Sequence, residues 1–174
     1  NTGNNPKGPG VIFSKGTVTI KGGTVKGCTA IEALASSAGN KTVVNIEGGV
    51  IEGLTYGVNW KGLGVAGQTD GSKTSVNKGE PGSVINDAVQ INISGGKISA
   101  PQALGTSANN GIYAGFKLDI SGGEIDGGNG TAMYLVAVGE TTISGGKISG
   151  EQAIRIAAGE LNITGGTITG TVIG

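Results

Sequence analysis

The segment TTISGGKISG, residues 141–150, is one of six versions of the same short sequence along this chain. The other five are TVTIKGGTVKG (17–27), VVNIEGGVIEG (43–53), QINISGGKISA (90–100), KLDISGGEIDG (117–127) and LNITGGTITG (161–170). Aliphatic and polar residues alternate before each Gly-Gly pair, with Thr141 as the one exception, and another aliphatic residue follows the pair. A period of two in β-branched residues predicts short strands that bury one face.

A third strand is expected after the second strand of most repeats. The candidate segments are TAIEA (29–33), YGVNW (56–60), PQAL (101–104), TAMYL (131–135) and QAIRI (152–156). Their inward positions hold Ile31, Val58, Leu104, Met133 and Ile154. Glycine suits the corners between these strands, because sharp bends need a positive φ or a close approach of two backbones.

The spacing of the repeat predicts the fold. The Gly-Gly pairs begin at residues 22, 48, 95, 122, 145 and 165, so the repeat is 20–27 residues long apart from one gap of 47. One such unit cannot bury its apolar face, whereas units stacked every ~4.8 Å can. We therefore expect an all-β chain, a single-stranded parallel β-helix (β-solenoid) of about six to seven coils. The repeat length favours a right-handed helix over the left-handed type that uses multiples of six.

The whole chain, 1–174, is expected to form one domain. Residues 61–83, KGLGVAGQTDGSKTSVNKGEPGS, are polar, rich in glycine and without alternation, which predicts a surface loop inserted in the stack. The last residues, TGTVIG, stop in mid-pattern without a polar cap. An uncapped stack is prone to aggregate, so we expect the chain to be a fragment of a longer surface protein.

Composition argues against several classes of function. Twelve basic and twelve acidic residues balance, so no global field favours nucleic acid or an anionic membrane. No run of apolar residues is long enough to insert in a bilayer. The single Cys28 cannot form an internal disulfide, and the absence of histidine removes the commonest general base. We expect neither a cofactor nor a metal site.

Charged residues form one candidate catalytic group. Lys97, Glu124 and Lys147 follow the Gly-Gly pair in successive repeats and are expected to form a ladder of alternating charge. Glu124 and Asp126 share one face at ~6.5–7 Å, within the range of glycosidase carboxylate pairs. The flanking lysines should keep Glu124 ionised, which argues against a general acid. The segment from Gly127 resembles a calcium-binding turn, but Ala132 replaces its ligand aspartate.

A second polar column precedes the Gly-Gly pairs: Thr19, Asn45, Asn92, Asp119, Thr142 and Asn162. Neutral amides and hydroxyls predominate in it, so we expect a structural ladder of hydrogen bonds rather than a metal site.

The outward column of the third strand is the candidate ligand-binding site. Its expected members are Glu32, Asn59, Gly105, Tyr134 and Arg155. Tyr134 and Arg155 would be neighbours, and an aromatic ring with a guanidinium fork suits a sugar chain through stacking and bidentate hydrogen bonds. Asn59, Trp60 and Tyr56 complete the predicted ligand-binding set. The alternative is that Tyr134 and Arg155 only stack on each other.

The sequence Ile-Ser-Gly-Gly-x-Ile occurs at 93–98, 120–125 and 143–148. It resembles repeats of secreted bacterial β-helix proteins of the pectate-lyase-like superfamily. It is also similar to cell-surface β-helices that bind polysaccharide or act as adhesins. The resemblance implies a right-handed β-helix that is secreted or held at a bacterial surface. This chain lacks the Asp-Asp-Gly turns of the polysaccharide-binding group, and Arg155 is the only arginine available for lyase chemistry.

We therefore expect a non-catalytic extracellular module that binds a polysaccharide or acts as an adhesin. Its expected partners are a glycan and other domains of the same longer chain, with no nucleic acid and no membrane insertion. A structural stalk without a ligand is the first alternative, and a polysaccharide lyase or glycoside hydrolase is the second. An ice-binding solenoid would need a regular array of threonines, which the mixed outward columns do not provide.

Overall fold

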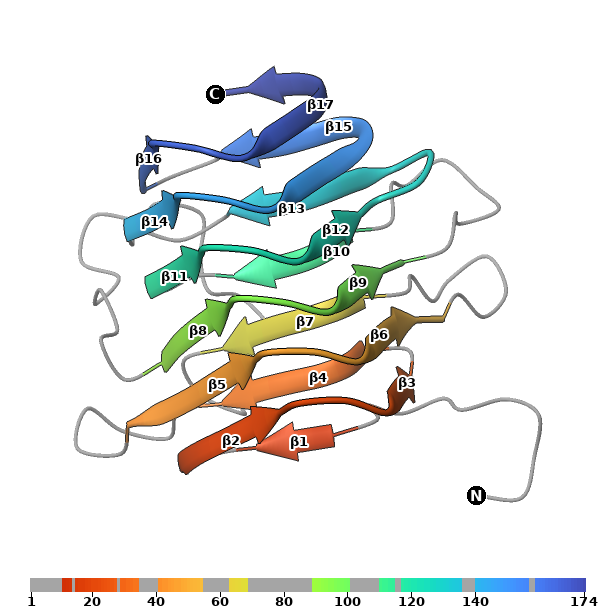
Figure 1. Cartoon of the computed structure of the whole chain (residues 1–174), viewed down its shortest axis with the longest axis vertical. Coiled ribbons are helices and arrows are strands. Elements are labelled where there is room, and N and C mark those ends of the chain that lie inside the picture. The colour runs from red at the N-terminus through yellow and green to blue at the C-terminus, as the bar shows by residue number, and fades with distance from the viewer. Residues whose placement is uncertain are drawn as a thin grey trace.

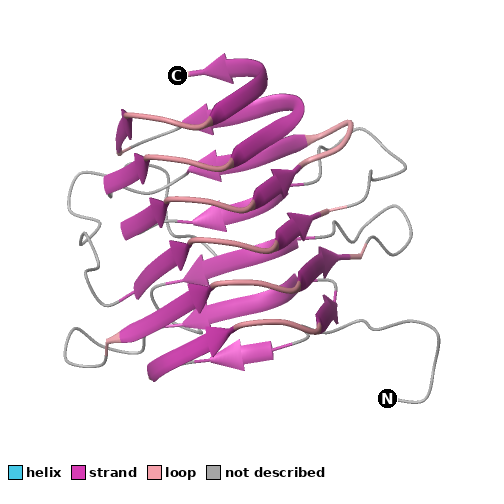
Figure 2. Ribbon diagram, viewed as in Figure 1, coloured by secondary structure: helices cyan, strands magenta, loops and turns pink. Residues whose placement is uncertain are grey.

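A computed structural model describes residues 11–13, 15–27, 29–34, 41–54, 63–68, 89–100, 110–114, 117–135, 140–156 and 159–174. Every regular element in these ranges is a β-strand, and the strands stack in layers along the long axis of the molecule (Figures 1 and 2). The described part contains no helix with the length and hydropathy needed to span a membrane.

The strands that precede the Gly-Gly corners form one sheet. They are β2 (Gly16–Ile20), β5 (Thr42–Ile46), β8 (Val89–Ile93), β11 (Lys117–Ile120), β14 (Glu140–Ile143) and β16 (Glu160–Ile163). They pair in the order β16-β14-β11-β8-β5-β2, and each strand runs parallel to its neighbours. Each repeat therefore adds one strand to this sheet, next to the strand of the repeat before it.

The strands that follow the corners belong to an 11-stranded sheet with two arms. The first arm holds β3 (Thr24–Gly27), β6 (Val50–Gly53), β9 (Lys97–Ser99) and β12 (Glu124–Asp126). The second arm holds β1 (Val11–Phe13), β4 (Thr29–Leu34), β7 (Leu63–Gln68), β10 (Asn110–Ala114) and β13 (Thr131–Leu135). The long strands β15 (Lys147–Ile156) and β17 (Thr167–Ile173) run through both arms.

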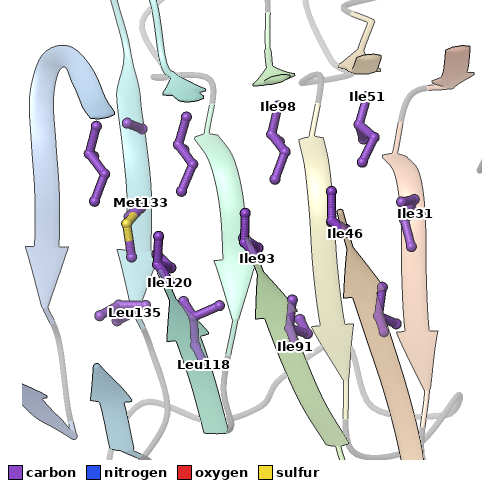
Figure 3. Close-up of a cluster of buried hydrophobic side chains, with 14 of the residues drawn as sticks. Ile31, Ile46, Ile51, Ile91, Ile93, Ile98, Leu118, Ile120, Met133 and Leu135 are labelled. Atoms are coloured by element: carbon purple, nitrogen blue, oxygen red, sulfur yellow. The ribbon is translucent and has the colours of Figure 1, made fainter. Parts of the chain in front are cut away.

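The register brings equivalent residues of successive repeats side by side. Ile20, Ile46, Ile93, Ile120, Ile143 and Ile163 form one such column. Its inner members are buried, and Figure 3 shows Ile46, Ile93 and Ile120 in a row inside the stack. Stacking identical aliphatic side chains supplies the apolar burial that one short repeat lacks. The expected all-β, parallel architecture is confirmed, and it is compatible with a β-solenoid.

The Gly-Gly corners explain why the repeated sequence keeps both glycines. A Cβ on Gly122 would lie 2.3 Å from the carbonyl oxygen of Ser94 in the preceding repeat. Gly123 has a φ of +81°, and its Cβ would lie 2.8 Å from the oxygen of Gly95. The first glycine makes room for the neighbouring backbone, and the second also adopts a conformation that L residues avoid.

In two repeats, a later segment of the chain than predicted forms the third strand. β7 and β10 occupy the places expected for 56–60 and 101–104, and Val65 and Ile112 take the register positions expected for Val58 and Leu104. Residues 56–60 and 101–104 lie outside the described part of the chain. The prediction assumed short connections, but a longer loop adds little closure entropy and lets a later segment pair instead.

The predicted loop insertion at 61–83 is wrong over its first part for the same reason. Strand β7, Leu63–Gln68, lies within this range and pairs with β4 and β10. Residues 69–83 lie outside the described part of the chain.

Candidate functional site

Tyr134 and Arg155 project from neighbouring strands of the second arm. Tyr134 on β13 is the register partner of Arg155 on β15. Met133 and Leu135 on either side of Tyr134 are buried, while Tyr134 is half-buried and Arg155 is exposed. Successive side chains of a strand point to opposite faces, so burial of Met133 and Leu135 fixes the backbone here and places the Tyr134 side chain on the face away from the core.

The two side chains contact each other. The Cζ atom of Arg155 lies 5.0 Å from the centroid of the Tyr134 ring, within the range of cation–π attraction. Among the described residues, no carboxylate forms an ion pair with Arg155. A guanidinium has five N–H donors, so contact with one ring leaves donors for a planar acidic or hydroxyl-bearing ligand.

The register extends this column in a way that differs from the prediction. Along the second arm, the register column that contains Tyr134 and Arg155 is Glu32, Ala66, Tyr113, Tyr134, Arg155 and Ile173. Ala66 and Tyr113 thus take the positions expected for Asn59 and Gly105. The predicted open step beside Tyr134 is instead a second tyrosine position. Asn59, Trp60 and Tyr56 lie outside the described part of the chain.

Tyr113 is the residue that the sequence interpretation missed. The search for a third strand counted forward from each Gly-Gly corner, and NGIYA (110–114) lies too far from the corner at Gly95 to be found that way. Counting back from the next repeat would have found it, because Ala114 ends only three residues before Lys117 begins β11.

The charged ladder of the first arm is present as predicted. Lys97, Glu124 and Lys147 are register partners on β9, β12 and β15. The Nζ atoms of Lys97 and Lys147 lie 3.3 Å and 3.8 Å from Oε1 of Glu124. Glu124 is therefore between two cations on a partly exposed surface.

Asp126, the other member of the candidate catalytic pair, also has a charged partner and a hydrogen-bond donor. Its Oδ2 lies 3.6 Å from Nζ of Lys97, and its Oδ1 accepts a hydrogen bond of 2.9 Å from the backbone N–H of Gly128. A glycosidase needs one carboxyl group held protonated in an apolar environment. Glu124 and Asp126 instead lie on a partly exposed surface, in contact with two lysines and a backbone N–H donor.

The ladder makes stability depend on pH at the alkaline end. A hydrogen bond to Glu124 raises the pKa of Lys97 above its ordinary 10.5; burial opposes this rise, and the charges of Glu124 and Asp126 add to it. Because the folded-state pKa is the higher one, the stabilisation is complete below pH 10.5 and is lost as the pH rises through the folded value.

We therefore expect wild type to lose slightly more unfolding free energy than Lys97→Met between pH 7 and pH 11, by at most about 1 kcal/mol for so exposed a pair. Urea denaturation at both pH values measures this difference. An equal loss in the two proteins would contradict the stabilising role of the ladder.

Side chains of the polar column on the six-stranded sheet form hydrogen bonds with one another. Nδ2 of Asn92 donates to Oδ1 of Asn45 at 2.8 Å, and Nδ2 of Asn45 donates to Oγ1 of Thr19 at 3.3 Å. The predicted ladder of amides and hydroxyls is confirmed in these repeats. These two hydrogen bonds stabilise the register, and their donor and acceptor groups are already partnered within the protein.

Within the described ranges, no group of three or more Asp, Glu, Cys or His residues is arranged to hold a metal ion. Comparisons of the chain with models of protein families, with curated proteins and with solved structures found no match in any of the three. The column around Tyr134 and Arg155 therefore stands as the candidate site on its own geometry.

Proposed function

We propose that the chain is a single-stranded, right-handed parallel β-helix of about six to seven coils, and that it is an extracellular, non-catalytic module that binds polysaccharide at a bacterial surface. The order of the strands supports the first part, because each repeat adds one strand to the six-stranded sheet and then contributes to the two arms. Right-handed crossovers are the rule between parallel strands. The resemblance of the Ile-Ser-Gly-Gly-x-Ile repeats to bacterial surface β-helices supports the second part.

The observation that carries the binding proposal is the exposed Arg155 in contact with Tyr134 on an outward column of parallel strands. A sugar ring can stack on an aromatic face or edge while a guanidinium holds its hydroxyl or carboxylate groups. The column continues to Tyr113 by register, so successive positions are spaced by one strand, ~4.8 Å. An extended polymer that lies across the strands meets these positions in turn.

A structural stalk without a ligand is the second candidate, and a specific observation favours it. Arg155 and Tyr134 contact each other, so part of their binding capacity is used within the protein. A stalk needs only the stacked strands and no outward recognition. The stalk and the binding module therefore differ in one testable respect, which is retention of a glycan.

The experiment is a binding screen on immobilised polysaccharides with an assay for products. Polygalacturonate and alginate serve as acidic probes, and xylan and a mixed-linkage β-glucan serve as neutral ones, each with calcium or with a chelator. We expect saturable retention on at least one polymer without new reducing or unsaturated ends. Retention on none of the four polymers would favour the structural stalk. Product formation would contradict the argument that Glu124 and Asp126 are not a catalytic pair.

A further inference from the structure

Thr141 is a polar residue inside the apolar core. It stands in the inward column of the six-stranded sheet, where Leu118 and Leu161 are its register partners. Thr141 is 3% exposed, and among the described residues its hydroxyl has no hydrogen-bond partner. The buried Thr131 differs in this respect, because its Oγ1 donates to Oε1 of Gln152 at 3.1 Å. A buried polar group without a partner costs free energy, which it regains once water can reach it.

Two carboxylates meet next to Thr141. Glu140 on β14 and Glu160 on β16 are register partners, and both are exposed. Among the described residues, neither carboxylate forms an ion pair. Glu160 accepts a hydrogen bond of 3.2 Å from Nδ2 of Asn162, which lies in its own strand and not across the contact. Like charges directly opposite each other on neighbouring strands are destabilising, so this pair weakens the contact between β14 and β16.

Each earlier contact between successive repeats carries an attraction between side chains. These attractions are ion pairs or an amide hydrogen bond, in chain order Lys21–Glu47, Lys26–Glu52, Asn45–Asn92, Lys97–Glu124 and Glu124–Lys147. Among the described residues, no attraction of this kind joins residues 140–156 to residues 160–173. Thr164 Oγ1 does donate to Ile143 O at 3.4 Å across this contact, but Ser121 and Ser144 make equivalent bonds at two of the earlier contacts.

We infer that the contact between residues 140–156 and residues 160–173 is the weakest in the described stack, and that the stack opens there first. The stability of a repeat protein is approximately a sum over repeats and their nearest-neighbour contacts, so local opening begins at the weakest contact. Opening lets water reach the Thr141 hydroxyl and separates Glu140 from Glu160. These groups lie between two described repeats, so they act in the same way whatever follows Gly174.

The candidate ligand-binding site stays whole when this contact opens. Tyr134 and Arg155 lie on β13 and β15, on the same side of the opening. Figure 1 shows β16 and β17 in the layer that follows β14 and β15. Ile173 on β17 is the register partner of Arg155 that would move away. Opening therefore uncovers one side of Arg155 and leaves its contact with Tyr134 in place, whether or not a polysaccharide binds.

Amide hydrogen exchange, measured residue by residue by NMR, tests where the stack opens. Thr164 N donates to Ile143 O across the proposed opening, and Ser144 N donates to Ile120 O across the contact before it. Both bonds are 2.8 Å long, so bond length does not separate the two amides. After correction for intrinsic exchange rates, we expect the amide of Thr164 to exchange at least about tenfold faster than that of Ser144.

Two variants each remove one source of weakness. Thr141→Val replaces the hydroxyl with a methyl group, so no polar group is left to gain from water, and we expect the exchange of Thr164 to slow at least about fivefold. Glu160→Lys replaces the repulsion of Glu140 with an attraction, and we expect exchange to slow about twofold. Thr142→Val makes the same change as Thr141→Val at the neighbouring, half-buried position. This control should leave the exchange of Thr164 unchanged.

Three outcomes would overturn the inference. Equal exchange of Thr164 and Ser144 in wild type would show that this contact is not the weakest. Fast exchange of Thr164 that neither variant slows would assign the opening to another cause, such as the position of the repeat in the stack. Loss of the folded state in Thr141→Val, measured by circular dichroism, would contradict a hydroxyl that costs stability.

Discussion

Gly122→Ala should destabilise the protein severely, by about 3 kcal/mol or more, because overpacking here acts against backbone rather than a flexible side chain. The added Cβ would lie 2.3 Å from the oxygen and 3.0 Å from the carbonyl carbon of Ser94. Relief requires the two repeats to separate, which breaks the hydrogen bonds from Ser121 N and Gly122 N to Ile93 O. Thermal unfolding should show a decrease in Tm of about 10 °C for a chain of this size.

Gly22→Ala is the matched control for this prediction. The residue has the same place in the repeat, but nothing lies within 4 Å of its Cβ. We expect a change in unfolding free energy of less than about 0.5 kcal/mol. Equal losses of stability in Gly22→Ala and Gly122→Ala would contradict close contact between successive corners.

Ile120→Ala should be nearly as damaging, with a loss of about 2–5 kcal/mol in unfolding free energy. Ile120 is 1% exposed and lies between Ile93 and Ile143 in its column. Neighbours on both sides are held by parallel pairing, so they cannot move in to fill the cavity. The loss therefore combines the transfer free energy of the removed methyl and methylene groups with the cost of a cavity.

The comparison for this variant lies in the same column. Ile163→Ala removes the same atoms from a side chain that is 48% exposed, so we expect less than half the loss of Ile120→Ala. Urea denaturation of both variants measures the difference. Equal losses in Ile163→Ala and Ile120→Ala would contradict the difference in burial between the middle of the column and its last member.

The strands around each Gly-Gly corner could be predicted from sequence, because alternation and the paired glycines occur together there. Ile93, Gly95 and Ile98 keep fixed distances from one another in every repeat, so one motif predicts two strands and their register. The charged ladder at Lys97, Glu124 and Lys147 followed from that register without further assumptions. Local geometry determines this part of the fold.

The third strand is different, because its register depends on the neighbouring repeats and not on the corner. Leu63–Gln68 and Asn110–Ala114 pair correctly although the connections before them differ in length from those of other repeats. The same difference decides which residues of the candidate site could be predicted. Tyr134 and Arg155 were predicted as neighbours because both of their repeats have short connections. Tyr113 was missed because its repeat does not.

The role of Arg155 separates the binding module from the stalk. In a stalk, the contact of Arg155 with Tyr134 serves stability alone, and loss of an exposed cation–π contact costs about 0.5–1 kcal/mol of stability. In a binding module, Arg155→Ala weakens retention on a glycan by far more than it changes stability. Stability and retention must therefore be measured on the same variants.

The most direct test of the binding proposal is affinity electrophoresis of wild type, Tyr134→Ala and Thr142→Ala in gels that contain each of the four polysaccharides. Thr142 lies on the outward face of the six-stranded sheet, away from the candidate site, and its variant controls for surface changes in general. The proposal predicts that at least one polymer retards wild type and Thr142→Ala equally, while Tyr134→Ala stays folded and is retarded at least about tenfold more weakly. Equal retardation of all three proteins, or unfolding of Tyr134→Ala, would contradict a binding site at Tyr134 and Arg155.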